Sequence, residues 1–336
     1  MSRPWLSILV PVYNVLPYLG ECIASALADG VEGVELLMLE DCSTDGSDRL
    51  AEQLARQHAP QARLLRHERN GGLSAARNTL IEAAGGEYLW FLDSDDALLP
   101  GAVTSLKACI ERHDHPDLVL CDFRTLREPF KLKHRLRGEL HRHTFPGPAD
   151  RRLSDRDALL GGVFAQGHLH SWSKIARREL WAASGLRFPA GHYFEDMATT
   201  PALLLAARSY VYMDEVWVGY RQRAGSILAC GSPGKIDDMM RALASLPALA
   251  AAQEPPLSEQ ASFQASHFAA KTFITACRFD AEAPERLRQH LAAFEQFSLL
   301  PVPELLRAYH RRRWHWRAQR LKHWLARCTR AGRAAC

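Results

Sequence analysis

Apolar runs alternate with helix-spaced apolar positions along the first 125 residues of the chain. The runs predict strands at 6–12, 35–39, 63–66 and 87–92, and apolar spacings of three and four residues predict helices at 16–28, 47–57 and 73–84. Strand–helix units repeated in this order favour a mainly parallel sheet with helices on both faces. The pattern therefore predicts an α/β fold.

Polar residues gather where each predicted strand ends. In parallel sheets, ligands bind in the crevice at the carboxyl ends of the strands. We therefore expect the binding site to be built from the four clusters that follow the strands, namely Tyr13-Asn14, Glu40-Asp41, Asn70-Gly71-Gly72 and Asp93-Ser94-Asp95-Asp96.

The last of these clusters places three carboxylates at the end of an apolar strand. Carboxylates this close repel one another, and the repulsion grows as the local dielectric constant falls. A divalent cation would offset it, and Mg²⁺ or Mn²⁺ in such oxygen sites is usually bound together with substrate phosphates. The chain has neither a Gly-x-x-x-x-Gly-Lys-Ser/Thr loop nor a Gly-x-Gly-x-x-Gly motif. This combination favours an enzyme that takes a nucleotide diphosphate through a metal ion.

The rest of the chain has a different pattern. Residues 126–152 are rich in Arg, Lys and His and show no period, so we interpret them as an exposed loop or linker. Ordered patterns return at 153–226, and from 227 onwards the chain is helical in pattern and rich in Ala and Leu. We therefore expect three parts, at 1–125, 126–226 and 227–336, of which the last is a helical, basic extension.

Composition adds a charge asymmetry. The net charge of the 336 residues is +4, but residues 304–333 hold ten basic residues and one acidic residue. A basic tail is typical of proteins that contact phosphate groups. No apolar run approaches the ~20 residues that span a bilayer, and the start of the chain lacks a leader-like core, so we expect a cytosolic protein. The eight scattered cysteines predict reduced thiols rather than a zinc site.

Four motifs in chain order resemble the motif series of family 2 glycosyltransferases, which use the GT-A fold. They are Pro11-Val12-Tyr13-Asn14, Glu40-Asp41-Cys42-Ser43-Thr44-Asp45-Gly46-Ser47, Asn70-Gly71-Gly72-Leu73-Ser74-Ala75-Ala76-Arg77-Asn78 and the DXD motif Asp93-Ser94-Asp95-Asp96. The resemblance continues more loosely through Ser171-Trp172-Ser173-Lys174, Glu195-Asp196, and Tyr220-Arg221 with Ser226. Beyond about residue 230 we find none.

The resemblance implies roles for individual residues. Pro11, Tyr13 and Asp41 would line the nucleoside pocket, with Asp41 bonded to the base. Asp93 would contact the ribose or the metal shell, Asp95 would bind the metal, and the Glu195-Asp196 pair would supply the catalytic base. The further candidates for donor binding are Asn14, Arg77, Ser94 and Arg221.

One position departs from the family pattern. Cys42 stands where the family usually has glycine. If that position requires a positive φ, a cysteine there carries strain that glycine would not. The departure concerns the local turn and leaves the expected fold unchanged.

The chemistry of glycosyl transfer fits these residues. The transition state resembles an oxocarbenium ion, the acceptor hydroxyl needs a base, and a metal offsets charge on the leaving diphosphate. One base opposite the leaving group gives inversion, which is also the family habit. We expect a Mn²⁺- or Mg²⁺-dependent hexosyl- or N-acetylhexosaminyl-transferase in polysaccharide biosynthesis, with a UDP-sugar donor and one sugar moved per encounter to a glycan or lipid-linked acceptor. We expect no nucleic acid partner, and the oligomeric state stays open.

Several alternatives remain open at this stage. Either acid of the Glu195-Asp196 pair could be the base, or both could cap a helix. Arg77 could be a surface residue, and Arg221 and Arg223 could be solvated charges. The basic tail could pack on the body or contact an anionic membrane at its inner face. The protein could also be a nucleotidyltransferase or an inactive nucleotide-sugar or glycan-binding module.

Overall fold

The computed structural model describes residues 3–127, 129, 132–222 and 232–333, so Arg223 and Ser226 lie outside the described residues. The chain divides into two compact units. Unit 1 comprises Met1–Asp155 and His170–Ala224, and unit 2 comprises Arg156–Leu169 and Gly225–Cys336.

A parallel half-sheet opens unit 1 and matches the predicted strands closely. Its strands run in the spatial order β3-β2-β1-β4, with in-register parallel pairing such as Leu6 with Val34 and Leu6 with Tyr88. Strands β1 and β4 are buried throughout, which explains their continuous apolar character. The strands are β1 (Leu6–Val12), β2 (Val34–Glu40), β3 (Ala62–Arg66) and β4 (Tyr88–Phe91).

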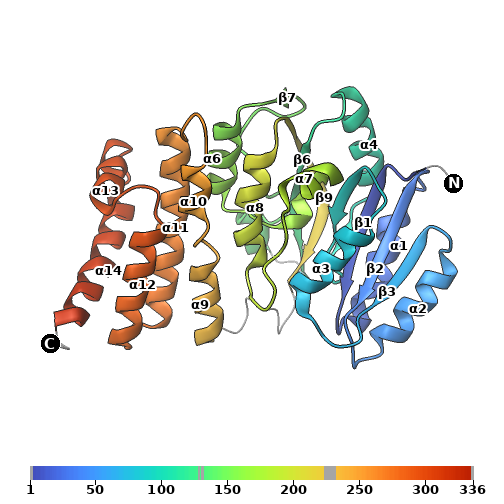
Figure 1. Cartoon of the computed structure of the whole chain (residues 1–336), viewed down its shortest axis with the longest axis horizontal. Coiled ribbons are helices and arrows are strands. Elements are labelled where there is room, and N and C mark those ends of the chain that lie inside the picture. Colours follow the sequence, from blue (N-terminus) through green and yellow to red (C-terminus); the bar gives the residue numbers. More distant parts are fainter. Residues whose placement is uncertain (1–2, 128, 130–131, 223–231, 334–336) are drawn as a thin grey trace. The chain divides into compact units, whose positions relative to one another are not determined.

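Right-handed crossovers decide which face each helix covers. Helices α1 (Leu16–Leu27) and α2 (Ser47–Gln57) connect strands that step from β1 to β3, so they lie on one face of the sheet (Figure 1). Helix α3 (Gly72–Ala83) returns the chain from β3 to β4 and packs on the opposite face, against β1 and β2. The carboxyl ends of β1, β2 and β4 therefore meet beside the start of α3.

The second half of the sheet is mixed rather than parallel. The order continues β4-β8-β6-β9-β5, where β8 is antiparallel to both neighbours, β6 and β9 are parallel, and β5 is antiparallel to β9. The elements here are α4 (Ala102–Arg112), α7 (Arg178–Ser184), α8 (Glu195–Ala206), β5 (Ala97–Leu98), β6 (Leu118–Leu126), β8 (Lys174–Arg177) and β9 (Tyr210–Arg221).

The described residues between 126 and 152 include regular structure, where the sequence suggested a loop or linker. They contain α5 (Leu132–Leu136), and Phe123 bridges to Arg142 in an antiparallel sense. Glu139, Thr144 and Phe145 are buried. The strand β7 (Arg152–Leu153) then pairs with β9. His141 and His143 of this segment pair with Asp122 of β6, and Arg127 pairs with Glu139 at 2.9 Å, whereas Lys133, Arg135 and Arg137 are exposed.

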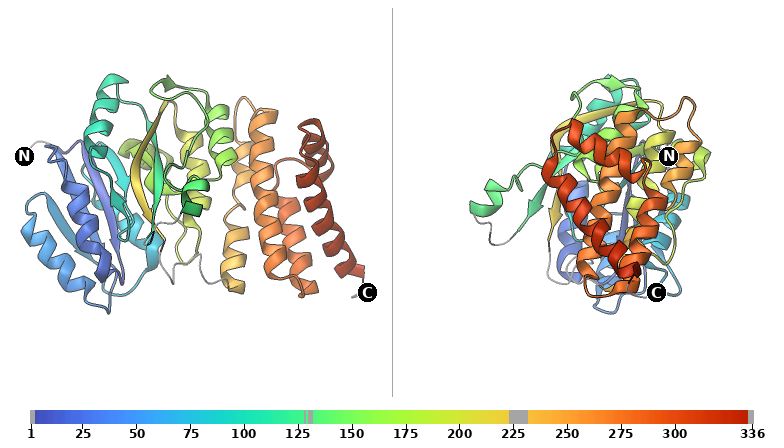
Figure 2. Two further views of the ribbon diagram at one scale, coloured as in Figure 1. Left: turned by 180° about the vertical axis from the view of Figure 1, so that it is seen from behind. Right: turned by 90° about the vertical axis from the view of Figure 1, so that its left-hand side faces the viewer.

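Unit 2 is helical, as its Ala- and Leu-rich sequence predicted. The long helix α11 lies among the other helices of this unit (Figure 2) and contacts α6, α9, α12, α13 and α14. Its buried residues include Phe263, Phe273 and Cys277. The helices are α6 (Arg156–Gln166), α9 (Pro233–Arg241), α10 (Leu246–Ala251), α11 (Glu259–Phe279), α12 (Pro284–Phe297), α13 (Val302–Arg311) and α14 (His315–Arg333). Among the described helices, none combines the length and apolarity that a membrane span requires.

Candidate active site

The turn after β4 concentrates negative charge. Asp93 and Asp95 are partly exposed, whereas Asp96 is buried and accepts a hydrogen bond from the backbone N–H of Arg221 at 2.7 Å. The second carboxylate oxygen of Asp96 is buried and has no hydrogen-bond partner among the described residues. Burial, together with Asp93 and Asp95, raises the pKa of Asp96 well above its ordinary value. The turn therefore has the electrostatics of a site for a positive ligand.

Arg77 joins this turn to the predicted catalytic acids. Its guanidinium is 1% exposed, and it donates to Asp93 Oδ1 at 2.8 Å, Glu195 Oε1 at 2.7 Å and Asp196 Oδ1 at 2.9 Å. Burial opposes the charge, but Asp196, Asp93 and Glu195 together hold the pKa of Arg77 above its ordinary value. Arg77 is thus an internal ion-pair centre and not the surface residue that its Ala-rich helix allowed.

The two acids begin helix α8 and differ in access to solvent. The side chain of Glu195 is 9% exposed and that of Asp196 is 17% exposed. Burial raises the pKa of Glu195 to about 7, against the lowering effect of Arg77. Phe194, directly before the pair, has φ of 61°, which is a left-handed backbone rarely adopted by aromatic residues. Such strained positions often mark functional sites.

Asn78 fixes the helix that carries Arg77. Its amide donates to the carbonyl of Phe188 at 2.9 Å and accepts from the N–H of Phe188 at 2.9 Å. The ring of Phe188 lies 5.2 Å from the Arg77 guanidinium in a cation–π arrangement. Asn78, which follows Arg77 in the sequence, therefore holds Phe188 in place beside the Arg77 guanidinium.

Asp41 is occupied by backbone contacts in this structure. Its two carboxylate oxygens accept from the N–H groups of Gly71 and Gly72, each at 2.8 Å, and His67 Nδ1 lies 2.7 Å from Oδ1. Asp41 therefore holds the loop that opens α3, the helix of Arg77. Its predicted contact with the nucleobase stays a prediction. His67 was not singled out from the sequence, where nothing local linked it to Asp41.

Cys42 adopts the backbone that its motif position implied. Its φ is 64°, and its thiol donates to the carbonyl of His67 at 3.4 Å. Asn14 also has a positive φ, of 51°, and its side-chain oxygen accepts from the N–H of Thr44 at 2.8 Å. Asn14 therefore ties the end of β1 to the loop after β2, and Cys42 ties that loop to the end of β3.

The other candidates for donor binding lie in varied environments. Tyr13 is 49% exposed at the end of β1, whereas Pro11 within β1 and Ser94 in the acidic turn are buried. Arg221, the last residue of β9, donates to the carbonyl of Asp95 at 2.9 Å and to Glu21 Oε2 at 2.7 Å. Arg221 is therefore tied to the acidic turn.

Lys174 is a charged residue that sequence reasoning undervalued. It is 1% exposed, and its Nζ donates to the carbonyl of His170 at 2.8 Å and to Ser173 Oγ at 2.7 Å. Burial lowers its pKa to about 7, and the charge of Asp196 opposes this effect. The Ser171-Trp172-Ser173-Lys174 motif was the available signal, but it did not indicate burial, because lysines are seldom fully buried.

The carboxylates after β4 fit a divalent cation. Asp93 and Asp95 supply hard oxygen ligands, which Mg²⁺ and Mn²⁺ prefer. Burial and the neighbouring carboxylates of Asp93 and Asp95 raise the pKa of Asp96, which shows how closely the acidic groups are gathered at this turn. The residues present are therefore compatible with the metal that the sequence implied.

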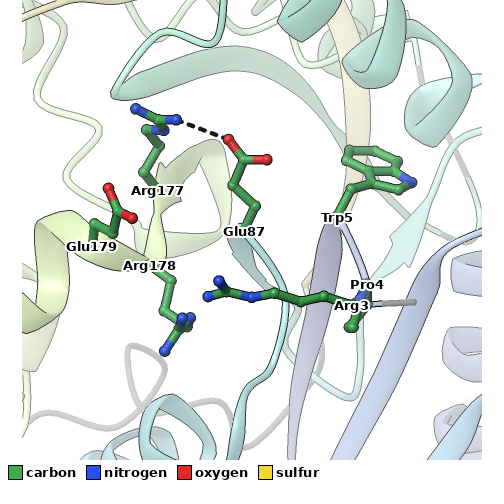
Figure 3. Close-up of a pocket in the computed structure, with 7 residues that line it drawn as sticks. All are labelled: Arg3, Pro4, Trp5, Glu87, Arg177, Arg178 and Glu179. Atoms are coloured by element: carbon green, nitrogen blue, oxygen red, sulfur yellow. Dashed lines mark hydrogen bonds and ion pairs between the residues drawn. The ribbon is translucent and has the colours of Figure 1, made fainter. Parts of the chain in front are cut away.

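A described pocket lies elsewhere in unit 1. It has a volume of about 250 Å³ and is lined by Arg3, Pro4, Trp5, Glu87, Arg177, Arg178 and Glu179 (Figure 3). These residues precede β1 and β4 or lie where β8 ends and α7 begins, so they are at the end of the strands opposite the acidic turn. Glu87 already pairs with Arg177 at 2.9 Å, and Arg178 donates to the carbonyl of Gly86 at 3.1 Å. The pocket therefore belongs to the scaffold.

Solved structures share this fold. S. aureus TarS residues 1–349, solved with UDP-GlcNAc, superposes with a TM-score of 0.69 at 19% identity, covering 98% of this chain and 92% of that one. The mannosyltransferase PcManGT from Pyrobaculum calidifontis, solved with GDP-Man and Mn²⁺, gives a TM-score of 0.51 at 16% identity, over 98% and 88% of the two chains. The sheet and its flanking helices thus define the GT-A class of fold.

The family follows from the sequence. Residues 7–163 match the model of glycosyl transferase family 2 and belong to that family. The uncharacterized glycosyltransferase EpsJ of Bacillus subtilis is 31% identical over 231 residues, and GlyG of Streptococcus pneumoniae is 27% identical over 224 residues. These matches cover 67% and 66% of this chain, and 63% and 72% of the relatives. The chain therefore spans somewhat less than two thirds of EpsJ.

Proposed function

We propose that the chain is an inverting glycosyltransferase that moves one sugar from a nucleotide sugar to a hydroxyl group of a glycan or lipid-linked acceptor in surface polysaccharide synthesis. The observation that carries the proposal is the convergence on Arg77 of Asp93, from the DXD motif, with Glu195 and Asp196. The family match supports glycosyl transfer over nucleotidyl transfer. The TarS complex with UDP-GlcNAc supports a UDP-sugar donor and a hexosyl or N-acetylhexosaminyl group.

Asp196 is the base in this proposal. An acceptor hydroxyl is a weak nucleophile and needs a carboxylate within hydrogen-bond reach. Two properties of the acid pair favour different residues, since burial raises the pKa of Glu195 to about 7 while the side chain of Asp196 is the more exposed. Reach is the first requirement for a general base. Glu195 then serves to hold Arg77, which orients Asp196 through the shared Nη1.

Asp95 and Asp93 are the ligands of the divalent cation in this proposal. A cation bound there would offset the negative charge that develops on the departing diphosphate. Arg77 keeps Asp93 oriented, and Arg221 fixes the backbone of Asp95. These two contacts hold the carboxylate ligands before the donor arrives, so little reorganisation is needed on binding.

Paired substitutions of the two acids test the base assignment. Release of UDP from a panel of UDP-sugars, with water as acceptor, gives kcat without knowledge of the natural acceptor. Asp196→Asn should lower kcat by roughly 10²–10⁴-fold while UDP affinity in Mn²⁺, measured by calorimetry, stays unchanged. Glu195→Gln keeps its size and a hydrogen-bonding oxygen for Arg77 and should cost much less. The reverse ranking would make Glu195 the base, and two active variants would move the base elsewhere.

Asp95→Ala tests the metal and the reaction class together. UDP affinity in Mn²⁺ should fall, and excess EDTA should have the same effect on the unsubstituted protein, because the diphosphate is held largely through the cation. Full activity in EDTA would refute the metal assignment. UDP binding without turnover of any UDP-sugar would favour an inactive binding module. Pyrophosphate release from UTP and a sugar phosphate would favour nucleotidyl transfer.

The acceptor side of the proposal includes an anionic membrane surface. Helix α14 exposes Arg320, Lys322 and Arg330, and Trp316 is 76% exposed near its start. Exposed basic and aromatic side chains on one helix are typical of proteins that lie on anionic lipid. In contrast, Leu305, Tyr309 and Leu321 of α13 and α14 are buried within unit 2. Deletion of the tail would therefore disturb packing, and surface substitutions are the better test.

A further inference from the structure

A second cluster of metal-ligating side chains lies in unit 1 away from the acidic turn. Asp122 of β6, His141 and His143 place their ligand atoms within 4.8 Å of one another. His141 Nε2 is 2.7 Å and His143 Nδ1 is 2.8 Å from Asp122 Oδ2. The two imidazole rings lie 4.3 Å apart, with 37° between their planes. Three features of this cluster point to a bound ligand. They are the position of both histidines on one face of their segment, the burial of the Asp122 carboxylate and the hydrogen bonds that support this carboxylate.

Backbone pairing with β6 places both histidines on the same face of their segment. Arg142 exchanges two hydrogen bonds with Phe123, of 2.7 and 3.3 Å, so residues 141–143 run as an extended segment along β6. Side chains alternate between the two faces of such a segment. His141 and His143 therefore lie on the opposite face from Arg142. Asp122 shares the face of the two histidines, because it is the neighbour of Phe123, with which Arg142 pairs. A His-x-His segment beside a carboxylate on the neighbouring strand thus brings three ligands together.

The carboxylate of Asp122 is fully buried, with 0% of its side chain exposed. Among the described residues, its ion-pair partners are the two histidines alone. A buried carboxylate without compensating positive charge costs several kcal/mol. A divalent cation between the three groups would supply that charge, and the three ligand atoms already lie within 4.8 Å of one another.

Supporting hydrogen bonds orient the carboxylate. The hydroxyl of Tyr212 donates to Asp122 Oδ2 at 2.8 Å, and the N–H of Thr144 donates to Oδ1 at 2.8 Å. Carboxylate ligands of metals are typically held by such outer contacts. The histidine side chains are 41% and 57% exposed, so an ion can enter from solvent and the rings can adjust. The cluster is therefore a fixed carboxylate facing two adaptable imidazoles.

We propose that Asp122, His141 and His143 bind Zn²⁺, with water as the fourth ligand, and that this ion fastens the segment from α5 to Thr144 onto β6. Two imidazole nitrogens and one carboxylate oxygen suit Zn²⁺, whereas the all-oxygen set of Asp93 and Asp95 suits Mg²⁺ or Mn²⁺. Zinc bonds are about 2.0–2.2 Å long, so the two imidazole nitrogens would move apart from Asp122 Oδ2, from which they now lie 2.7 and 2.8 Å away. No cysteine is involved, so the site is distinct from the zinc motifs that the cysteine spacing excluded.

Metal binding by the tag-free full-length protein tests this proposal. Calorimetric titration with Zn²⁺ should give one site, and Co²⁺ should give the visible absorption of a four-coordinate complex. His141→Ala and His143→Ala should each weaken Zn²⁺ binding by at least about 100-fold, because loss of an outer-shell partner alone costs about 10–100-fold. Both histidines are exposed, so these variants should fold. Zn²⁺ should also protect the backbone amides of residues 139–144 from hydrogen exchange.

Two controls separate this site from other metal binding. His115→Ala removes an exposed histidine that also pairs with one carboxylate, Glu87 at 3.0 Å, and it should bind Zn²⁺ as the unsubstituted protein does. Asp95→Ala should likewise keep the zinc site, so failure of the proposed donor site leaves this result unaffected. Absence of Zn²⁺ binding at micromolar concentration, or unchanged binding in both histidine variants, would overturn the proposal.

Discussion

Arg77→Met removes a buried cation that donates to Asp93, Glu195 and Asp196, and it leaves an apolar side chain of similar length in its place. Loss of one partner from a buried ion pair typically costs about 3–5 kcal/mol, because the remaining charge is buried without compensation. The carboxylates here are partly buried, with Glu195 the least exposed of the three. We therefore expect a cost within that range and not above it.

The cost converts to a measurable shift in melting temperature. For a unit of about 200 residues, such as unit 1, each kcal/mol lowers the melting temperature by about 2–4 °C. Arg77→Met should therefore melt about 6–20 °C below the unsubstituted protein in differential scanning calorimetry near pH 8. The transition assigned to unit 1 should move, while the heat absorbed by unit 2 should not.

The melting deficit of Arg77→Met should depend on pH in a definite direction. Burial raises the pKa of Glu195 to about 7, so between its ordinary pKa and that value the folded state binds more protons than the unfolded state. The associated stability is fully present at low pH and is lost as the pH rises through about 7. Without Arg77 the pKa of Glu195 should rise further. The melting deficit of Arg77→Met should therefore be smaller near pH 5.5 than near pH 8.

Two variants complete the test. Arg77→Lys keeps the charge but loses the planar fork, and it should melt between Arg77→Met and the unsubstituted protein. Arg187→Met breaks an exposed pair with Glu82, whose atoms are 3.6 Å apart, and should change the melting temperature very little. A deficit for Arg77→Met no larger than that for Arg187→Met, at both pH values, would refute the assignment of Arg77 as an ion-pair centre.

Two further predictions concern the backbone and the tail. Cys42→Gly should be as stable as the unsubstituted protein or gain up to about 1 kcal/mol, while Cys42→Val should lose at least about 1 kcal/mol, because φ at this position is 64°; equal melting temperatures for the two variants would contradict this. Substituting Gln for both Arg320 and Lys322 on the exposed side of α14 should weaken co-sedimentation with anionic vesicles by about 30-fold at low salt, at about 1 kcal/mol per basic residue. Unchanged sedimentation would leave α14 a purely structural helix.

Strands β1 and β4 could be predicted because strands buried on both faces are continuous apolar runs in the sequence. The predicted run at 6–12 coincides with β1, Leu6–Val12. The mixed half gave weaker signals. Strands β5 and β7 have two residues each, too few to show a period, and β8 has four. Their antiparallel pairing depends on contacts distant in the chain, which no local pattern encodes.

In the candidate site too, local clusters could be predicted from the sequence, whereas contacts between distant residues could not. The DXD motif and the acid pair were visible as local clusters, and the motif around Arg77 was visible as a resemblance. The meeting of Arg77 with Glu195, 118 positions along the chain, was not visible, because an arginine in an Ala-rich helix has the same local signature on the surface as in an ion-pair centre. His141 and His143 were left without a role for a related reason. Their partner Asp122 lies in the first of the three predicted parts of the chain, and the charged stretch that holds the histidines resembled a linker.

The strained backbone at Phe194 explains why the acid pair needs Arg77. A left-handed residue of this kind costs about 1–2 kcal/mol, and it survives only where surrounding contacts outweigh that cost. Here it immediately precedes Glu195 and Asp196, both of which accept from Arg77 Nη1. The ion pairs therefore stabilise the left-handed conformation of Phe194. This conformation in turn places Glu195 and Asp196 beside the same guanidinium. Removal of Arg77 should accordingly loosen the first turn of α8 before the rest of unit 1, seen as faster hydrogen exchange at Met197, whose N–H now donates to the carbonyl of Phe194 at 3.0 Å.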